Sequence, residues 1–150
     1  MPHSYSSCLI HYVWSTKECR NLISANLQPR LWAYLGGIAN QNEMKALAVG
    51  GTDNHVHVLV SLPSTLSIAK AAQLFKGGSS KWVHDTYPTH QNFAWQEGYG
   101  AFSIGVAGVQ DTVAYIDAQA EHHRTSSFED EFLSFLKRHG LDYDDRYVWG

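Results

Sequence analysis

Two histidines stand two residues apart in the segment 53–60, whose sequence is DNHVHVLV. Because alternate side chains of a β-strand project to the same face, His55 and His57 are expected to lie side by side, with the valines between and after them on the opposite face. Two imidazoles at this spacing can bind one cation, each through a single ring nitrogen. Asp53 and Asn54 add oxygen donors beside the pair, but they are also ordinary turn residues. The segment therefore predicts a strand with a two-histidine metal site, and two exposed or hydrogen-bonded histidines are the alternative.

A tyrosine and a glutamine four residues apart form a second candidate pair, Tyr115 and Gln119. They lie in a segment with an apolar stripe at helical spacing, formed by Val109, Val113, Ile116 and Ala120. On a helix the pair shares one flank, about 100° from that stripe, so Tyr115 is not expected to serve the core. A phenol and an amide placed there can supply a nucleophile and an oxygen ligand at one site. An exposed pair with no function is the alternative.

The elements that must position these residues follow from hydrophobic periodicity. Strands are predicted at about 7–14, 46–49, 55–61 and 99–106. Helices are predicted at about 24–42, 67–85, 109–120 and 127–139, with Ser67 capping the second and Ser126 forming a capping box with Glu129 in the last. Gly77 and Gly78 each cost a helix about 1 kcal/mol, which indicates a close backbone approach or a bend.

The order β-α-β-β-α-β followed by helices is that of the split βαβ arrangement. The predicted fold class is therefore α+β: a ferredoxin- or RRM-like antiparallel sheet with helices on one face, plus C-terminal helices. His55 and His57 would face the side of the sheet that the first two helices leave open.

Length and charge narrow the function classes. The chain has 150 residues without a repeat or linker, so one domain spanning 1–150 is expected. Eleven Lys and Arg against 14 Asp and Glu give a net charge of −3, which argues against a broad basic surface for nucleic acid. Any nucleic acid must be held locally, by a short strip, a folded shape or a metal. Cys8 and Cys19 have no metal-type spacing. No signal peptide or membrane span is expected, so the predicted location is the cytoplasm.

Six blocks follow one another along nearly the whole chain, at 11–17, 53–63, 75–82, 93–103, 115–119 and 122–124. Their sequences are HYVWSTK, DNHVHVLVSLP, FKGGSSKW, FAWQEGYGAFS, YIDAQ and HHR. In this order they resemble the single-tyrosine HUH transposases of bacterial insertion sequences and their REP-associated relatives, which act on single-stranded DNA. A single block would be weak support, whereas six in family order are specific.

The resemblance implies a role for each candidate residue. His55 and His57 would bind a divalent metal, Mg2+ or Mn2+, and Gln119 would complete its ligand shell. Tyr115 would attack the DNA, forming a 5′-phosphotyrosine link and releasing a 3′-hydroxyl, and a second 3′-hydroxyl could later rejoin the DNA without ATP or water. Because imidazoles favour softer metals than magnesium, manganese is expected to support activity at least as well. The sequence does not identify the base that deprotonates Tyr115.

The resemblance also implies partners. Members of the family recognise hairpins in single-stranded DNA and act as homodimers, and in many the tyrosine helix of one subunit serves the histidines of the other. The candidates for DNA backbone contacts are Lys17, Arg20, Lys76, Lys81 and Arg124, for which a solvated charged face is the alternative. Trp82 and Trp95 could stack on bases, although Trp82 lies on an apolar helix face and suits the core. His122 shares the flank of Tyr115 and could have an accessory or merely a surface role.

Three other functions remain open at this stage. A host-adopted, REP-associated protein would cut the same hairpins without mobilising its own gene. An RRM-like module would bind nucleic acid without catalysis, but it should carry stacking aromatics where His55 and His57 stand. A hydrolase using a metal-activated water would leave Tyr115 and Gln119 without a role.

Overall fold

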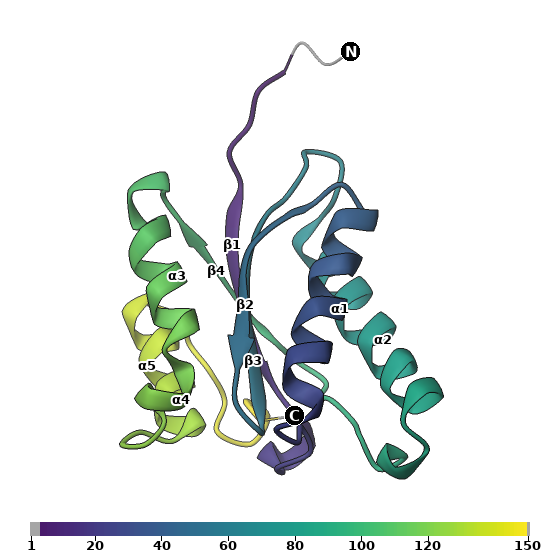
Figure 1. Ribbon diagram of the computed structural model, residues 1–150. Helices are drawn as coiled ribbons and strands as arrows, with labels where there is room; N and C mark the ends of the chain where they lie inside the picture. Colours follow the sequence, from purple (N-terminus) through teal and green to yellow (C-terminus); the bar gives the residue numbers. More distant parts are fainter. Residues whose placement is uncertain (1–3, 150) are drawn as a thin grey trace.

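The sheet lies at the centre of the computed structural model, which describes residues 4–149 (Figure 1). Its strands, within that range, are β1 (Leu9–Ser15), β2 (Lys45–Gly51), β3 (His55–Ser61) and β4 (Gly100–Ile104). They are arranged in the order β2-β3-β1-β4, and each neighbouring pair is antiparallel. This is the order of the split βαβ arrangement, so the predicted fold class is confirmed. Residues 1–3 and 150, which the predicted domain includes, lie outside the described residues.

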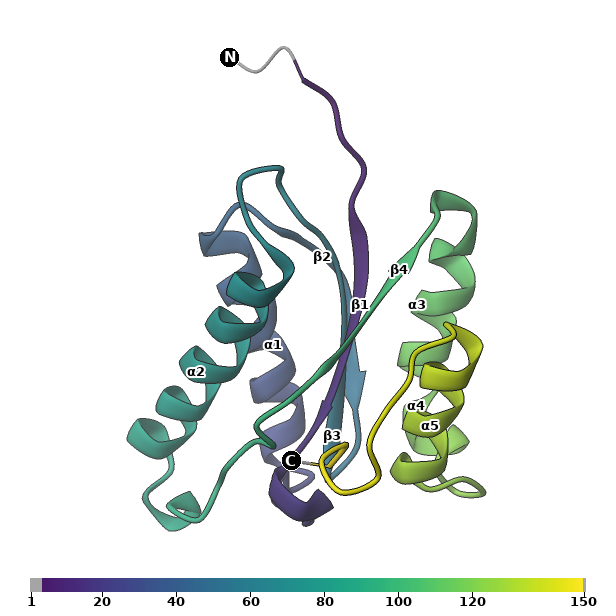
Figure 2. The same ribbon diagram turned by 180° about the vertical axis from the view of Figure 1, so that it is seen from behind.

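Helices cover both faces of the sheet (Figures 1 and 2). One face carries α1 (Leu27–Gln41) and α2 (Ile68–Thr86), and the other carries α3 (Val109–Asp117), α4 (Gln119–His122) and α5 (Phe128–Arg138). Short 3-10 helices at Lys17–Cys19, Pro88–His90 and Val106–Gly108 lie in the connections. Between residues 4 and 149, no helix is long and apolar enough to cross a membrane.

The prediction that the histidine face stays open is therefore wrong. The reason is the strong amphipathicity of α5, whose apolar side chains need burial. They are Phe128, Phe132, Phe135 and Leu136, and they pack with Val13 and Phe102 of the sheet in a second hydrophobic cluster. The C-terminal helices therefore roof the side of the sheet on which the candidate site lies.

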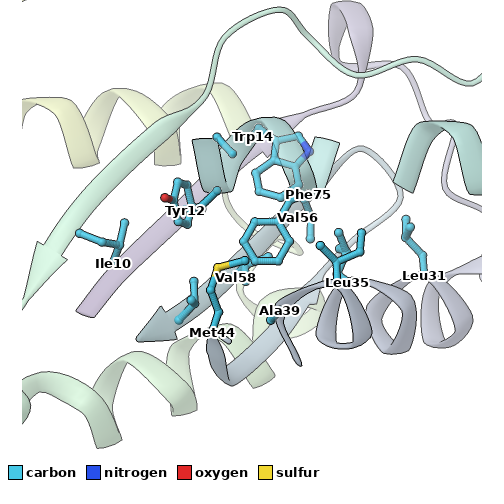
Figure 3. Packing of buried hydrophobic residues seen from close by; sticks show 14 of the residues in the cluster. Ile10, Tyr12, Trp14, Leu31, Leu35, Ala39, Met44, Val56, Val58 and Phe75 are labelled. Atoms are coloured by element: carbon cyan, nitrogen blue, oxygen red, sulfur yellow. The ribbon is translucent and has the colours of Figure 1, made fainter. Parts of the chain in front are cut away.

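The main core lies between the sheet and the pair α1 and α2 (Figure 3). Its fully buried members include Tyr12 and Trp14 of β1, Val56 and Val58 of β3, and Phe75 of α2. The valines of the H-V-H-V-L-V run thus point into the core, as the alternation of the strand predicts. This packing fixes the register of β3 and hence the position of the histidines between the valines.

Helix α2 begins where its sequence indicates and runs unbroken through both glycines. The hydroxyl oxygen of Ser67 accepts a hydrogen bond from the backbone N–H of Lys70 at 3.0 Å, which confirms the predicted N-cap. A Cβ at Gly78 would lie 3.1 Å from Cδ1 of Ile38 on α1. Gly78 therefore marks a close approach of two helices and not a bend.

Two helix predictions near the site need correction. The single helix predicted at 109–120 is divided at Ala118 (φ −98°, ψ 18°), where α3 ends and α4 begins. The cap of α5 is Ser127, whose hydroxyl accepts from the backbone N–H of Asp130 at 3.1 Å, and not Ser126 with Glu129. Ser127 has the extended backbone that a cap requires, while the carbonyl of Ser126 binds His123.

Candidate active site and metal centre

The two histidines of β3 lie beneath the C-terminal helices. His55 and His57 are both fully buried, and their contacts include residues of α3, α4 and α5 and His123. Nε2 of His55 lies 2.8 Å from Oε1 of Gln119, and Nε2 of His57 lies 3.1 Å from Oε1 of Glu131. The strand therefore aims both ring nitrogens at groups brought by the C-terminal helices.

Four side chains converge at this point: His55, His57, His123 and Glu131, called here the His–Glu cluster. One potential ligand atom from each lies within 4.8 Å of all the others. Oε1 of Glu131 is 3.1 Å from Nε2 of His57, 3.1 Å from Nε2 of His123 and 3.6 Å from Nε2 of His55. Metal–ligand bonds of about 2.0–2.1 Å in a tetrahedral site require ligand–ligand distances of about 3.4 Å. The cluster thus has the donors and the spacing to hold a divalent metal.

Outer hydrogen bonds direct these imidazoles toward the cluster. Nδ1 of His57 lies 2.8 Å from Nε2 of His11, and Nδ1 of His55 lies 2.9 Å from Oδ1 of Asn54. Nδ1 of His123 lies 2.7 Å from the carbonyl oxygen of Ser126. Partners of this kind fix the tautomer and orientation of metal-binding histidines.

His123 provides the clearest test of whether a metal fits. A carbonyl oxygen can only accept, so Nδ1 of His123 donates to Ser126, and in the neutral ring Nε2 carries a lone pair. Nε2 is buried without a hydrogen-bond partner among residues 4–149, although Oε1 of Glu131 is 3.1 Å away. A lone pair facing a carboxylate oxygen at this distance needs a cation between them, either a proton or a metal. The donor set fits a metal ion.

The charges of the cluster are consistent with this. Burial, reinforced by the proximity of His57, lowers the pKa of both His11 and His55 to about 3, so both imidazoles are neutral near pH 7. Burial alone would raise the pKa of Glu131, but the proximity of His123 and His57 holds it well below its usual range. Burial likewise opposes protonation of His123, yet Glu131 raises its pKa overall. The neutral imidazole of His55 and the ionised carboxylate of Glu131 are forms that bind metals, whereas His123 must give up the proton that Glu131 favours before it binds one.

The predicted nucleophile joins the same cluster. Tyr115 of α3 is half-buried, its ring centroid lies 5.7 Å from that of His57, and its hydroxyl donates to Oε2 of Glu131. Burial and the bond to Glu131 raise the pKa of Tyr115, so the phenol keeps its proton in this arrangement. Gln119 is buried, and its amide donates to the carbonyl of Tyr115 at 3.3 Å. The structure thus brings together all four residues predicted for the catalytic and metal site.

The residues predicted to bind DNA mostly contact acidic or backbone groups of the protein itself. Arg20, Lys81 and Arg124 are exposed and pair with acidic neighbours, namely Glu18, Asp85 and Glu121 respectively. Lys17 lines a hollow of about 320 Å³ together with Ala94, Trp95 and Glu97. Three of the positive charges are therefore paired with carboxylates, in agreement with the acidic balance of the chain.

The ammonium group of Lys76 is engaged by backbone carbonyls of the protein itself. Its Nζ donates to the carbonyl oxygens of Gln96, Glu97 and Gly98 at 2.7, 2.8 and 2.7 Å. Partial burial lowers the pKa of Lys76 to about 8. The side chain therefore ties α2 to the loop that leads into β4. Nothing in this arrangement leaves its ammonium free for a phosphate.

Aromatic and histidine candidates have mixed outcomes. Trp82 stacks on Tyr34 with ring centroids 4.5 Å apart, so it packs against the core as expected. Trp95 packs edge-on against Trp14, and its Nε1 donates to the hydroxyl of Ser79 at 2.9 Å. The side chain of His122 is 40% exposed, and its Nε2 lies 3.8 Å from Oε2 of Glu131, so it stands at the entrance of the site.

Sequence reasoning assigned no role to Glu131, His123 or His11. A signal for Glu131 was present, since its position falls between Phe128 and Phe135 on the apolar stripe of α5, where a carboxylate is unexpected. His123 belongs to the last of the six blocks, but its sequence position alone does not indicate a role. His11 opened the first block, and its place behind His57 depends on the pairing of β1 with β3.

Comparisons with known proteins identify the family and support the fold. The family model described as "Transposase IS200 like" matches residues 4–119, a range that contains His55, His57, Tyr115 and Gln119. A candidate transposase from Deinococcus radiodurans R1 has a similar structure, with a TM-score of 0.64, 19% identity, and coverage of 79% of this chain and 95% of that one. A REP-associated tyrosine transposase bound to a REP hairpin has a TM-score of 0.59 at 16% identity, covering 82% of this chain and 73% of that one. No curated protein sequence matches.

Proposed function

The chain belongs to the IS200-like transposase family, and from this we propose that it cleaves and rejoins single-stranded DNA through a covalent bond to Tyr115. The observation that carries the proposal is the position of the Tyr115 hydroxyl, which lies at the His–Glu cluster with Gln119 on the adjoining turn. A phenol that served only packing would not be expected to hydrogen-bond with a buried group of potential metal ligands. We also propose that residues 1–150 act as one domain.

The reaction is a phosphodiester exchange. The oxygen of Tyr115 attacks phosphorus, the bond between phosphorus and the 3′-oxygen breaks, and the Tyr115 proton leaves the phenol while the departing strand gains one as a 3′-hydroxyl. The number of phosphodiester bonds is conserved, so a new 3′-hydroxyl can reverse the step and join a different strand. Before the attack, Tyr115 must release its hydrogen bond to Glu131.

His55, His57 and Gln119 are the residues proposed to hold a divalent ion during this reaction. Such an ion supplies positive charge to the oxygens of the scissile phosphate as charge develops on them. The neutral state of His55 at pH 7 suits this role. Because two of the three donors are imidazoles, we expect Mn2+ to support the reaction at least as well as Mg2+.

Hairpin-bearing single-stranded DNA is the substrate we propose. The support is the family and the structural likeness to a transposase described in complex with a REP hairpin. Lys17, Arg20, Lys81 and Arg124 are the exposed candidates for backbone contacts, and Lys76 is retained only as a support for the loop at 96–98. A homodimer is proposed on the family resemblance, although Tyr115 already contacts the cluster of its own chain.

The direct test is trapping of the covalent intermediate. Labelled single-stranded hairpin DNA is incubated with the protein and Mn2+, and a denaturant-resistant adduct is sought. Tyr115→Phe should lose the adduct while still binding the hairpin. Tyr34→Phe is the matched control, because Tyr34 stacks on Trp82 far from the cluster and should retain the adduct. An adduct that persists in Tyr115→Phe would refute the assignment of the nucleophile.

A host-adopted, REP-associated protein would use the same chemistry. The likeness to a REP-associated transposase is the observation that favours it. The DNA around the gene distinguishes the two biological roles: hairpin ends bounding one element indicate transposition, and many scattered hairpin repeats indicate the host-adopted role.

A further inference from the structure

The His–Glu cluster is closed in the arrangement that the structure shows. His55 and His57 have side-chain exposures of 0%, and that of Glu131 is 2%. A DNA phosphodiester must reach the Tyr115 hydroxyl and the metal-binding nitrogens at the same time. It cannot do so while α5 lies over them, so the site as described cannot yet contain its substrate.

The carboxylate of Glu131 occupies the place that a scissile phosphate needs. Its Oε1 lies among the Nε2 atoms of the three cluster histidines, and its Oε2 accepts the hydrogen bond of Tyr115. A reacting phosphate must likewise place one oxygen at the metal-binding atoms and its phosphorus beside the Tyr115 oxygen. Both groups are anionic and present two or more oxygens, so they compete for one position.

Two of the four cluster residues come from outside the part of the chain that the family model matches. His123 and Glu131 follow residue 119, the end of the matched range. A short segment connects His123 to α5, and Ser127 caps the start of that helix. Ligation by these two residues would tie α5 to β3 across the active site.

Resting on the proposed function, we propose that the DNA-free protein closes its active site with α5, through a metal site formed by His55, His57, His123 and Glu131. DNA binding then requires the scissile phosphate to displace Glu131, after which Gln119, already 2.8 Å from Nε2 of His55, takes its place in the ligand set. Tyr115 is released in the same exchange, because its hydroxyl partner leaves with α5.

The donor set indicates the class of metal. Three imidazole nitrogens and one carboxylate oxygen, within 4.8 Å of one another, suit zinc or cobalt(II), whereas magnesium prefers six oxygens. The closed site is therefore expected to bind such an ion more tightly than the open set of His55, His57 and Gln119. Retention of the ion by four protein side chains leaves no open position for a phosphate, which makes closure and catalysis mutually exclusive.

The first experiment measures metal binding without DNA. Metal-stripped protein is titrated with Co2+, whose tetrahedral complexes absorb visible light far more strongly than its octahedral ones. We expect the intense spectrum in the wild type, and its loss with at least tenfold weaker binding in Glu131→Gln and in His123→Ala. Glu129→Gln, which changes an exposed carboxylate on the same helix, is the control and should bind as the wild type does.

The two variants protect the test against a folding artefact. If Glu131→Gln fails to fold, His123→Ala removes a different ligand and decides the question by itself. Wild-type Co2+ affinity in a folded Glu131→Gln or His123→Ala protein would overturn the closed site.

The second experiment measures closure by hydrogen exchange of the α5 amides, residues 128–138. Zn2+ alone should slow this exchange, and hairpin DNA should speed it again in Tyr115→Phe, where no covalent link forms. Glu131→Gln should also form the covalent adduct faster than wild type when Zn2+ is present. Unchanged α5 exchange on adding DNA that binds would refute displacement.

The two proposals fail in different ways. If no variant forms an adduct but Co2+ binding depends on His123 and Glu131, the closed metal site stands and the transposase chemistry fails. If the wild type forms the adduct at a rate that Glu131→Gln does not change, and α5 exchange is indifferent to Zn2+, the chemistry stands and the closure fails.

Discussion

The two faces of the sheet are built from the same strands but have opposite physical characters. Along β3, Val56 and Val58 enter the main core, whereas His55 and His57 enter the His–Glu cluster. Along β1, Tyr12 packs with the valines and its neighbour His11 supports His57. One strand alternation thus assigns packing to one side and chemistry to the other.

The difference shows how a small domain can accommodate buried polar side chains whose removal from water is unfavourable. Burying imidazoles and a carboxylate is unfavourable unless each is paired, and the cluster pairs them with one another and with polar neighbours such as His11, Asn54 and Gln119. The face toward α1 and α2 is apolar and supplies the compensating hydrophobic stabilisation. We therefore expect the first face to govern global stability and the second to govern metal binding and the opening of α5.

The largest expected effect compares a phenylalanine from each face. Phe75→Ala should lower the free energy of unfolding by about 3–5 kcal/mol, because Phe75 is fully buried between Tyr12 and Trp14. Phe135→Ala should cost less, since Phe135 belongs to α5, the helix that we propose can open, and packs from it on His11 and His57. Urea unfolding of metal-free protein measures both. A greater loss for Phe135→Ala would reverse the proposed division between the faces.

The sequence was sufficient to predict the face of the sheet that α1 and α2 cover, and it predicted the histidine face only in part. Periodicity located the strands, α1 and α2 because each has a local pattern that tertiary contacts do not override. The same reasoning placed His55 and His57 on one face and Tyr115 with Gln119 on one flank. Their convergence with one another depended on the family resemblance, because spacing within a strand or a helix says nothing of how the two meet.

The remainder of the site depends on docking that no local pattern encodes. Glu131 becomes a candidate ligand only because α5 packs over the histidine face, and the periodicity of α5 shows that it is amphipathic but not where it docks. His123 gains its orientation from the carbonyl of Ser126, a contact made within a connecting segment. Lys76 was a reasonable phosphate ligand by charge, but three loop carbonyls engage its ammonium.

The next largest expected effect is a loss of folding stability at acidic pH. His11 and His55 have folded-state pKa values of about 3 against 6.5 for the free side chain, so below pH 6.5 the unfolded chain binds protons that the folded protein does not. The contribution of these two histidines to the free energy of unfolding is therefore fully present above about pH 6.5 and is lost as the pH falls toward 3. The loss approaches about 1.4 kcal/mol per pH unit for each histidine.

Urea midpoints at pH 7, 6 and 5 in a chelator measure this loss. His11→Phe should show a shallower decline, because one of the two contributing histidines is absent. Equal stability of the wild type at pH 7 and pH 5 would contradict the assignment of buried, neutral imidazoles to the site face. The comparison also separates the faces, since the main core contributes no titrating histidine among its buried members in the described range 4–149.

A smaller effect distinguishes the two capped helices. Ser67→Ala and Ser127→Ala each remove a side-chain cap, at a cost of about 1 kcal/mol. Loss of the Ser67 cap should lower global stability, because α2 covers the main core. Loss of the Ser127 cap should instead speed hydrogen exchange in α5 and leave α2 protected, since α5 is proposed to open by itself. If exchange in α2 and α5 rises together in Ser127→Ala, the two faces open as one unit.

The smallest expected effect lies within α2 and leaves the site untouched. Gly77→Ala should stabilise the protein by about 0.5–1 kcal/mol, because Gly77 is exposed in a helix interior and a Cβ there meets nothing within 4 Å. Gly78→Ala should gain less, since its Cβ would approach Cδ1 of Ile38 to 3.1 Å and α1 must adjust. Thermal unfolding measures the pair, and the Co2+ affinity of both variants should equal that of the wild type. A changed Co2+ affinity would mean that packing between α1 and α2 reaches the metal-binding histidines through β3, and the separation of the two faces would then be incomplete.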